Sequence, residues 1–258
     1  MPHSTIDLLI ATIAAASVTA LAATLISRVL ASLREGGVVR RFLCRTVRTC
    51  LRLRATGAEH IPARGGVLIL ANHISYADAV AVQAAAGRTV RFLGTRKLLR
   101  HPIMRWVFRC FRVIPVDPVQ PRDAIRRALR ALRDGDCVCI FPEGHISEDG
   151  QLQPLHGGFE LLARRSGATV VPARIDGLFG TVFGRGAGRA ARLTAMGHSG
   201  AWVHFGPPVP GGILTRATAA RLLGGNTRAA RLGKPVWPKP PARPATRTAG
   251  KTQTTINP

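Results

Sequence analysis

Short apolar runs alternate with polar and amphipathic segments from about Gly57 onward. The runs are bounded by turn-forming residues, which is typical of buried β-strands. Four runs predict strands: Val67–Ala71, Val138–Phe141, Thr169–Ala173 and Trp202–Phe205. The segment Arg122–Arg133 instead carries apolar residues at helical spacing, and Gly135 follows it as a stop signal. Strands separated by an amphipathic helix predict an α/β fold in which helices cover a sheet.

A longer apolar stretch lies near the N-terminus. The twenty residues Leu8–Ser27 carry no charge, and a helix of that length spans about 30 Å, the hydrocarbon thickness of a bilayer. We therefore predict a membrane-anchoring helix in residues 1–30. A signal peptide is the first alternative, but Met1–Asp7 offers only His3 and an acid where such a peptide has a basic region. Because the stretch is rich in alanine, a shallow or packed helix is a further alternative.

The following segment, residues 31–56, is rich in arginine, and basic residues extend from Arg28 to Arg54 with only Glu35 opposing them. Four of its arginines recur at helical spacing, opposite apolar residues: Arg41, Arg45, Arg48 and Arg52. The pattern predicts a basic amphipathic helix at a membrane surface, where each arginine near anionic headgroups contributes about 1 kcal/mol. An ordinary solvated helix face is the alternative. Since basic residues flank the cytoplasmic side of membrane helices, the rest of the protein is predicted to lie on that side.

The body of the chain, residues 57–215, contains the alternating strands and helices and is predicted to form one domain without internal repeats. From about Arg216 the periodicity fades, and Pro235–Pro258 is rich in Pro, Thr, Lys and Arg. We therefore predict that residues 216–258 form a basic, disordered tail. After Asp176 the chain has no further Asp or Glu but twelve basic residues.

Composition adds a strong positive charge. The 258 residues include 37 Lys and Arg against 13 Asp and Glu, which gives a formal net charge of +24. This charge favours an anionic partner, which can be nucleic acid, an acidic membrane surface or a phosphorylated substrate. A nucleic-acid partner is disfavoured because aromatic residues are few (Trp 3, Tyr 1, Phe 9) and no recognised binding motif occurs. The five cysteines include no CxxC pair, which argues against a disulfide framework and against a zinc site.

The first group of chemistry-bearing residues follows the apolar run Val67–Ala71. It contains His73 and Asp78, which are five positions apart. In a continuous helix these side chains are about 140° apart and do not meet. They meet if His73 lies in the loop after the strand and Asp78 in the first turn of the next helix, where the carboxylate accepts from one ring nitrogen and leaves the other as a base. The alternative is a capping aspartate beside a structural histidine.

A second group lies at the end of another apolar run. Asp136–Gly144 is a predicted strand followed by a Pro-Glu-Gly turn that contains Glu143 and Gly144. Since sites in α/β sheets are built at the carboxyl ends of strands, the two polar loops are expected to converge on one cleft. The alternative for Glu143 is a solvated turn carboxylate.

Taken in order, these segments resemble the glycerolipid acyltransferases, a family that includes 1-acylglycerol-3-phosphate and lysophospholipid acyltransferases. Asn72–Asp78 is similar to the family's NHxSxxD signature, and Phe141–Gly144 is similar to its FPEG block. Phe111–Asp117 and Val171–Gly177 resemble the second and fourth blocks. The resemblance covers Leu51–Val209 and implies a mixed α/β sheet flanked by helices, preceded here by the predicted membrane helix and basic amphipathic helix.

The resemblance implies an O-acyltransferase in which His73 and Asp78 are catalytic. His73 would take the proton from the hydroxyl of a lysophospholipid, and Asp78 would hold its tautomer and stabilise the imidazolium. The hydroxyl oxygen would attack the thioester of an acyl-CoA or an acyl carrier protein. This donor is a co-substrate, so the resemblance implies neither a cofactor nor a metal. Glu143 and Gly144 would shape the acceptor pocket.

The chain departs from the family pattern at two positions expected to bind a phosphate. Members that accept a phosphate headgroup commonly carry an arginine two residues after the FPEG glycine and a basic residue that closes the second block. This chain has Ile146 and Pro118 there, and an apolar side chain does not reproduce bidentate recognition by arginine. Four basic residues lie close enough in the sequence to bind the substrate in their place: Arg96, Lys97, Arg112 and Arg122.

The leading prediction is therefore transfer of a fatty acyl group to a lysophospholipid, in phospholipid biosynthesis or remodelling. The alternative within the family is a 1-acylglycerol-3-phosphate acyltransferase that makes phosphatidic acid. Other classes that stay open are a basic nucleic-acid-binding protein and a thioester hydrolase that uses the His73–Asp78 pair with water as acceptor. Membrane lipids, the acceptor and the thioester donor are the expected partners. The expected location is the membrane, with the catalytic domain on its cytoplasmic side.

Overall fold

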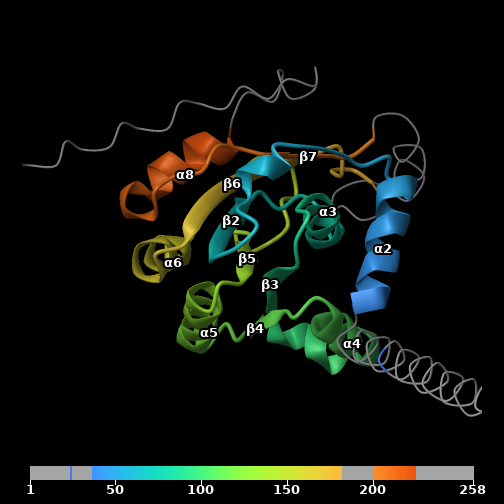
Figure 1. Ribbon diagram of the computed structural model, residues 1–258, viewed down its shortest axis with the longest axis horizontal. Coiled ribbons are helices and arrows are strands. Elements are labelled where there is room, and N and C mark those ends of the chain that lie inside the picture. The colour runs from blue at the N-terminus through green and yellow to red at the C-terminus, as the bar shows by residue number, and fades with distance from the viewer. Residues whose placement is uncertain (1–23, 25–36, 182–199, 225–258) are drawn as a thin grey trace, which may run out of the picture.

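The computed structural model describes residue 24, residues 37–181 and residues 200–224, and these form one seven-stranded sheet between helices (Figure 1). The spatial order of the strands is β1-β7-β6-β2-β5-β3-β4. Their bounds are β1 (Arg54–Thr56), β2 (Val67–Ala71), β3 (Val90–Thr95), β4 (Ile114–Val116), β5 (Cys137–Ile140), β6 (Thr169–Asp176) and β7 (Trp202–Phe205). Neighbouring strands are parallel except β6 and β7, which are antiparallel. The prediction of a mixed sheet flanked by helices is confirmed.

Two layers of helices cover the sheet (Figure 1). One layer contains α2 (Gly37–Cys50), α3 (Asp78–Ala85) and α4 (Pro102–Cys110), and the other contains α5 (Pro121–Arg133), α6 (Gly158–Ser166) and α8 (Arg216–Leu223). Three short 3₁₀ helices are η1 (Ala58–His60), η2 (Arg96–Arg100) and η3 (Gly211–Ile213). The central strand β2 shows why both layers are needed. Ile69 and Ala71 pack into the core beneath the first layer, whereas Leu68 and Leu70 pack into the core beneath the second.

The apolar runs predict four of these strands and miss three. The four runs correspond to β2, β5, β6 and β7, and the predicted amphipathic helix lies within α5. The apolar pattern alone does not indicate β1, β3 or β4. Strand β3 contains Arg91, whose guanidinium lies 2.8 Å from the carboxylate of Asp136, and Gly94 near its end. Arg91 and Gly94 interrupt the apolar run, although Val90 and Phe92 are buried.

Two domain boundaries differ from those drawn from the sequence. Strand β1 lies within residues 31–56, because it pairs with β7 and so begins the sheet before residue 57. Helix α8 lies within residues 216–258, because the side chain of Thr215 caps it by accepting a hydrogen bond from Thr218 N, and Leu223 is buried in the core. The prediction of disorder from Arg216 is therefore wrong for Arg216–Leu223. Residues 225–258 lie outside the described part.

The predicted membrane helix in residues 1–30 also lies outside the described residues, apart from Thr24. In the part of the chain that the structure describes, no helix is long and apolar enough to cross a bilayer. Helix α2 is amphipathic in the structure. Its Arg41 and Arg45 are exposed, whereas Leu43 and Val47 pack against the core.

The two cysteines of β5, Cys137 and Cys139, are buried free thiols. Burial raises the pKa of Cys137 to about 12 and raises that of Cys139 well above its usual value. Both thiols therefore stay protonated and serve as small apolar side chains in the core.

His204 on β7 provides a pH-dependent contribution to stability. Its ring is buried, Nδ1 lies 2.8 Å from Thr56 Oγ1, and Nε2 has no hydrogen-bond partner among the described residues. Burial lowers the pKa of His204, so the folded state binds this proton less readily than the unfolded state does. The free energy of unfolding is therefore expected to fall as the pH drops through the ordinary histidine pKa of about 6.5.

The variant His204→Gln removes the titrating group and should flatten this pH dependence. Urea unfolding of both proteins on either side of pH ~6.5 measures the effect. An equal fall in the free energy of unfolding in the two proteins would show that another group is responsible.

Candidate active site

The carboxyl ends of four parallel strands meet at one edge of the sheet, in the order β2, β5, β3, β4. His73 follows β2, the turn Phe141–Gly144 follows β5, Arg96 follows β3 and Asp117 follows β4. Neighbouring strands are about 5 Å apart, so segments that are distant in sequence are brought into one row. This is the edge at which α/β sheets carry their sites.

His73 and Asp78 meet at this edge. His73 lies in the loop after β2, and Asp78 is the first residue of α3. The distance from His73 Nδ1 to Asp78 Oδ2 is 2.9 Å. The side chain of Asp78 is fully buried, whereas that of His73 is 20% exposed. The pair thus joins the core to the surface through a histidine that a substrate can reach.

The carboxylate of Asp78 is held by the loop that precedes it. Oδ2 also accepts hydrogen bonds from the backbone N–H groups of Ile74 (2.6 Å) and Ser75 (2.9 Å), and Oδ1 accepts one from Ser75 Oγ (2.6 Å). Because the carboxylate acts as an acceptor in all these bonds, it selects the tautomer with hydrogen on His73 Nδ1. The lone pair of His73 is then on Nε2, which makes Nε2 the basic atom.

The ring of His73 is oriented by stacking. Phe141 lies parallel to it, with ring centroids 4.2 Å apart and planes inclined by 15°. Phe92 lies on β3, which pairs with β5, and stacks on Phe141 with ring centroids 6.4 Å apart. A stack of this kind restricts rotation of the imidazole, so that the direction of Nε2 is set by β5 and β3 as well as by Asp78.

The backbone of His73 is held on both sides. Its N–H donates to Glu143 Oε1 at 2.7 Å, and its carbonyl oxygen accepts from Ser147 N at 2.8 Å. Glu143 Oε2 accepts from Gln153 N at 2.8 Å. The two polar loops therefore converge as the sequence predicts, through backbone contacts of the β5 loop.

The position of Glu143 excludes the alternative interpretation of its side chain. It is fully buried, not a solvated turn residue, and both of its carboxylate oxygens accept backbone N–H groups. Burial raises the pKa of Glu143, although these two hydrogen bonds lower it. We therefore reassign Glu143 from substrate binding to positioning of the His73 loop.

Gly144 permits the turn after Glu143. Its φ is +74°, a conformation that favours glycine. A Cβ atom at this position would also approach the ring of His156 to 3.0 Å. Gly144 is exposed, and its predicted part in the acceptor pocket stays a prediction.

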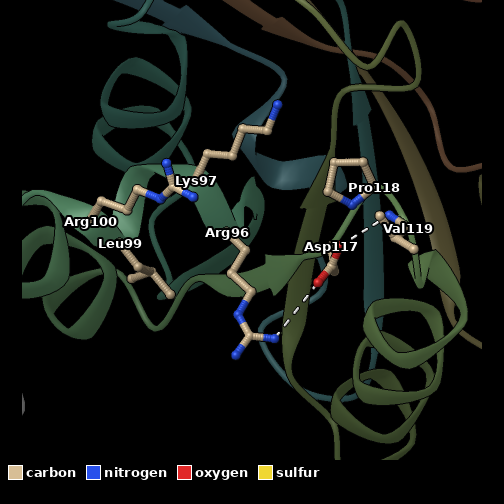
Figure 2. Close-up of a pocket in the computed structure, with 7 residues that line it drawn as sticks. All are labelled: Arg96, Lys97, Leu99, Arg100, Asp117, Pro118 and Val119. Carbon is tan, nitrogen blue, oxygen red and sulfur yellow. Dashed lines mark hydrogen bonds and ion pairs between the residues drawn. The ribbon is translucent and has the colours of Figure 1, made fainter.

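A basic groove lies farther along the same edge (Figure 2). It has a volume of about 490 Å³ and is lined by Arg96, Lys97, Leu99, Arg100, Asp117, Pro118 and Val119. The guanidinium of Arg96 points toward Asp117, with 3.7 Å between Nη1 and Oδ2, and the side chain of Arg96 is 70% exposed. Arg122 is exposed on the first turn of α5 and does not line the groove.

Pro118 and Ile146, which stand where the family commonly has a basic residue, have different surroundings. Pro118 lines the groove, whereas Ile146 is buried, with 7% of its surface exposed. Three cationic side chains from η2 line the groove together with Pro118: Arg96, Lys97 and Arg100.

The sequence analysis assigns no role to several residues of the site, although Asn72 and Ser75 belong to the NHxSxxD signature. Ser75 and Asp78 have the Ser-x-x-acid spacing of a capping box, and Ser75 N donates to Asp78 Oδ2, but the N-cap residue of α3 is Ala77. Asn72 exchanges two hydrogen bonds with the backbone of Ile175 on β6, at 2.7 and 2.9 Å. The contacts of Asn72 and Ser147 join distant segments and have no local signature in the sequence.

The arrangement is suited to general-base chemistry. Nε2 of His73 can remove a proton from a hydroxyl group, and the buried Asp78 carboxylate can stabilise the resulting imidazolium. The basic groove about two strands away offers cations for an anionic group on the same substrate.

Comparison with known proteins identifies similar chains. Residues 52–176 match the model of the protein family described as Acyltransferase. The chloroplastic 1-acyl-sn-glycerol-3-phosphate acyltransferase BAT2 of Brassica napus is 28% identical over 125 residues, which are 47% of this chain and 36% of that protein. The 1-acyl-sn-glycerol-3-phosphate acyltransferase of Borreliella burgdorferi is 27% identical over 128 residues, which are 48% of this chain and 51% of that protein. The chain thus matches between about a third and about half of the length of these relatives.

A solved structure has a similar fold. The 1-acyl-sn-glycerophosphate acyltransferase PlsC of Thermotoga maritima superposes with a TM-score of 0.57 at 19% identity. The match covers 80% of this chain and 86% of that chain. At this level of identity the likeness supports the architecture of the sheet and its helices.

Proposed function

We propose that this chain, whose residues 52–176 belong to the glycerolipid acyltransferase family, transfers a fatty acyl group to the free hydroxyl of 1-acylglycerol-3-phosphate. The observation that carries the proposal is the 2.9 Å hydrogen bond between His73 Nδ1 and Asp78 Oδ2 at the carboxyl edge of the sheet. The product of the reaction would be phosphatidic acid.

The choice of acceptor rests on two observations. The relatives from Brassica napus and Borreliella burgdorferi are both named 1-acyl-sn-glycerol-3-phosphate acyltransferases. In addition, the groove about two strands away from the His73 loop offers Arg96, Lys97 and Arg100 to a phosphate. These observations favour 1-acylglycerol-3-phosphate over the more general lysophospholipid acceptor, although Pro118 and Ile146 stand where the family commonly has basic residues.

In the proposed reaction, Nε2 of His73 takes the proton of the acceptor hydroxyl while its oxygen bonds to the carbonyl carbon of the thioester. The carbon–sulfur bond then breaks, and the thiol leaves with the proton returned by the imidazolium. Asp78 stabilises the charge on the ring throughout, and the stack with Phe141 keeps Nε2 directed at the hydroxyl. The donor is acyl-CoA or acyl carrier protein as a co-substrate, and these steps use no other cofactor.

The proposed location is the membrane that contains the lipid acceptor, with the catalytic domain on the cytoplasmic side. The strongly basic α2, with Arg41 and Arg45 exposed, supports a position at an anionic surface.

One experiment tests the reaction and its acceptor together. Purified protein in detergent is given a panel of lysolipids with one labelled acyl-CoA, and in parallel the same acyl group on acyl carrier protein, and the products are identified by mass. Labelled phosphatidic acid is the expected product. A different diacyl lipid would redirect the proposal to another headgroup. Consumption of the thioester without an acylated lipid would instead favour a hydrolase.

Replacing Arg96 with alanine is expected to raise the KM for 1-acylglycerol-3-phosphate by roughly 10- to 150-fold with little change in kcat. The reason is that a hydrogen bond to a charged group contributes about 1.5–3 kcal/mol. Steady-state kinetics in detergent micelles measure both constants. The matched variant Arg122→Ala removes the same charge from outside the groove and should have a much smaller effect. If Arg122→Ala has the larger effect, the phosphate binds at α5.

A further inference from the structure

The segment η2–α4 exposes a group of large apolar side chains. Leu98 is 44% exposed, Ile103 is 59% exposed and Trp106 is 44% exposed. Ile103 and Trp106 are three residues apart on α4, so they lie on the same side of the helix. Apolar side chains grouped in this way on a surface indicate a contact with a partner.

Helix α4 is firmly attached to the protein. Phe108 and Cys110 are buried. Arg40 of α2 donates to the carbonyl oxygen of Cys110 at 2.9 Å and to Thr89 Oγ1 at 3.1 Å. The exposed side of α4 is therefore presented by a helix that is held in place by its neighbours.

Basic residues surround these apolar side chains. The segment Ala79–Val116 contains no Asp or Glu, and the basic side chains of Arg100, Arg105 and Arg109 are exposed within it. Two acids outside this segment pair with arginines inside it: Asp117 with Arg96, and Asp136 with Arg91. We call this surface the α4 face, and it consists of Leu98, Arg100, Ile103, Arg105, Trp106 and Arg109.

We propose that the α4 face lies in the headgroup region of an anionic phospholipid bilayer. A tryptophan with aliphatic neighbours is suited to the boundary between acyl chains and headgroups, and flanking arginines extend to lipid phosphates. A nucleic acid would satisfy the charges but leave Leu98 and Ile103 exposed to water.

The α4 face also adjoins the basic groove. Arg100 belongs both to this face and to the basic groove, and η2 continues directly from β3. A lipid acceptor can therefore pass from the bilayer into the groove without crossing water. This part of the inference rests on the proposed acyl transfer, whereas the contact with the bilayer does not.

The test follows the fluorescence of Trp106 in the full chain. The variant Trp202→Phe with Trp237→Phe leaves Trp106 as the only tryptophan. It is mixed with vesicles of equimolar phosphatidylglycerol and phosphatidylcholine whose acyl chains are brominated. About half of the Trp106 emission or more is expected to be lost, because an interfacial helix buries its apolar side about 5–10 Å into the boundary.

The matched control keeps Trp202 alone, through Trp106→Phe with Trp237→Phe. Trp202 lies on β7, toward the other end of the sheet from β3 and β4, and its emission should be unchanged. Sedimentation with the vesicles establishes that both proteins are bound. Unquenched Trp106 emission in vesicle-bound protein would overturn the proposal, and it is the result expected if a second copy or another segment of the chain covers α4. Failure of the protein to bind the vesicles would overturn the proposal as well.

Charge reversal tests the role of the arginines. Arg105→Glu with Arg109→Glu is expected to require roughly tenfold more lipid for the same quenching of Trp106. Arg127→Glu with Arg130→Glu makes the same charge change at exposed positions of α5, in the other helical layer, and should have little effect. Equal effects of the two pairs would show that net charge, not the α4 face, determines binding. Acyl transfer is measured separately in detergent, where no bilayer is present. A failure of the proposed function can therefore be distinguished from a failure of the contact between the α4 face and the bilayer.

Discussion

Replacing His73 with alanine is expected to lower the kcat of acyl transfer by roughly 10²–10⁴-fold, the usual contribution of a positioned general base. Nε2 of His73 is the atom that the hydrogen bond to Asp78 leaves free to accept a proton. The substitution removes a side chain that is 20% exposed and keeps the backbone bonds to Glu143 and Ser147. The measurement is the rate of acylated lipid formation at saturating donor and acceptor, with circular dichroism as a check on folding.

Tyr76→Phe is the matched control in the same loop, because Tyr76 is 63% exposed and its substitution changes only a hydroxyl. It should leave kcat nearly unchanged. Asp78→Asn is a less specific test, because an amide group would face the N–H donors of Ile74 and Ser75 and would disturb the loop as well as the tautomer. Turnover of His73→Ala at the wild-type rate would exclude His73 as the base.

The central part of the fold follows from sequence because its signals are local. Strand β2 is buried on both sides and consequently reads as an unbroken apolar run, Val67–Ala71. The meeting of His73 with Asp78 also follows from a local rule, since a loop followed by a first helical turn is the arrangement that brings a pair of this spacing together. The family resemblance of the two motifs then indicates the chemistry.

The remaining features depend on contacts between distant segments. Strand β1 has three residues and exists because Arg54–Thr56 pairs with β7, almost 150 residues later. The stack of His73 on Phe141 requires β2 and β5 to be neighbours. No periodicity within either segment encodes these pairings, so the sequence indicates the residues of the site more fully than it indicates their supports.

The two departures from the family pattern have a structural interpretation. Pro118 lies in the groove but donates no hydrogen bond from its side chain or backbone nitrogen. Ile146 is buried and so does not face a substrate. Cations in this region come instead from η2, through Arg96, Lys97 and Arg100. Recognition of phosphate in this chain is therefore expected to depend on the loop after β3.

Glu143 differs from His73 because its effect is expected on both stability and catalysis. Its two carboxylate oxygens accept the N–H groups of His73 and Gln153 in a fully buried position. Glu143→Gln retains one acceptor oxygen but turns an amide N–H₂ group toward the other donor. Glu143→Ala removes both acceptors and leaves two backbone donors without their partner.

Glu143→Ala is expected to lower the free energy of unfolding by about 2–6 kcal/mol, since each of the two buried donors left unsatisfied costs about 1–3 kcal/mol. Urea unfolding measures this change, with Glu59→Gln, an exposed residue of η1, as a control expected to stay within about 0.5 kcal/mol. Because Glu143 holds the backbone of His73, the kcat of the folded variant should also fall, with the KM for the thioester less affected. A Glu143→Ala protein with lower stability but wild-type kcat would restrict Glu143 to the fold, whereas loss of both ties the orientation of the base to a carboxylate that no substrate touches.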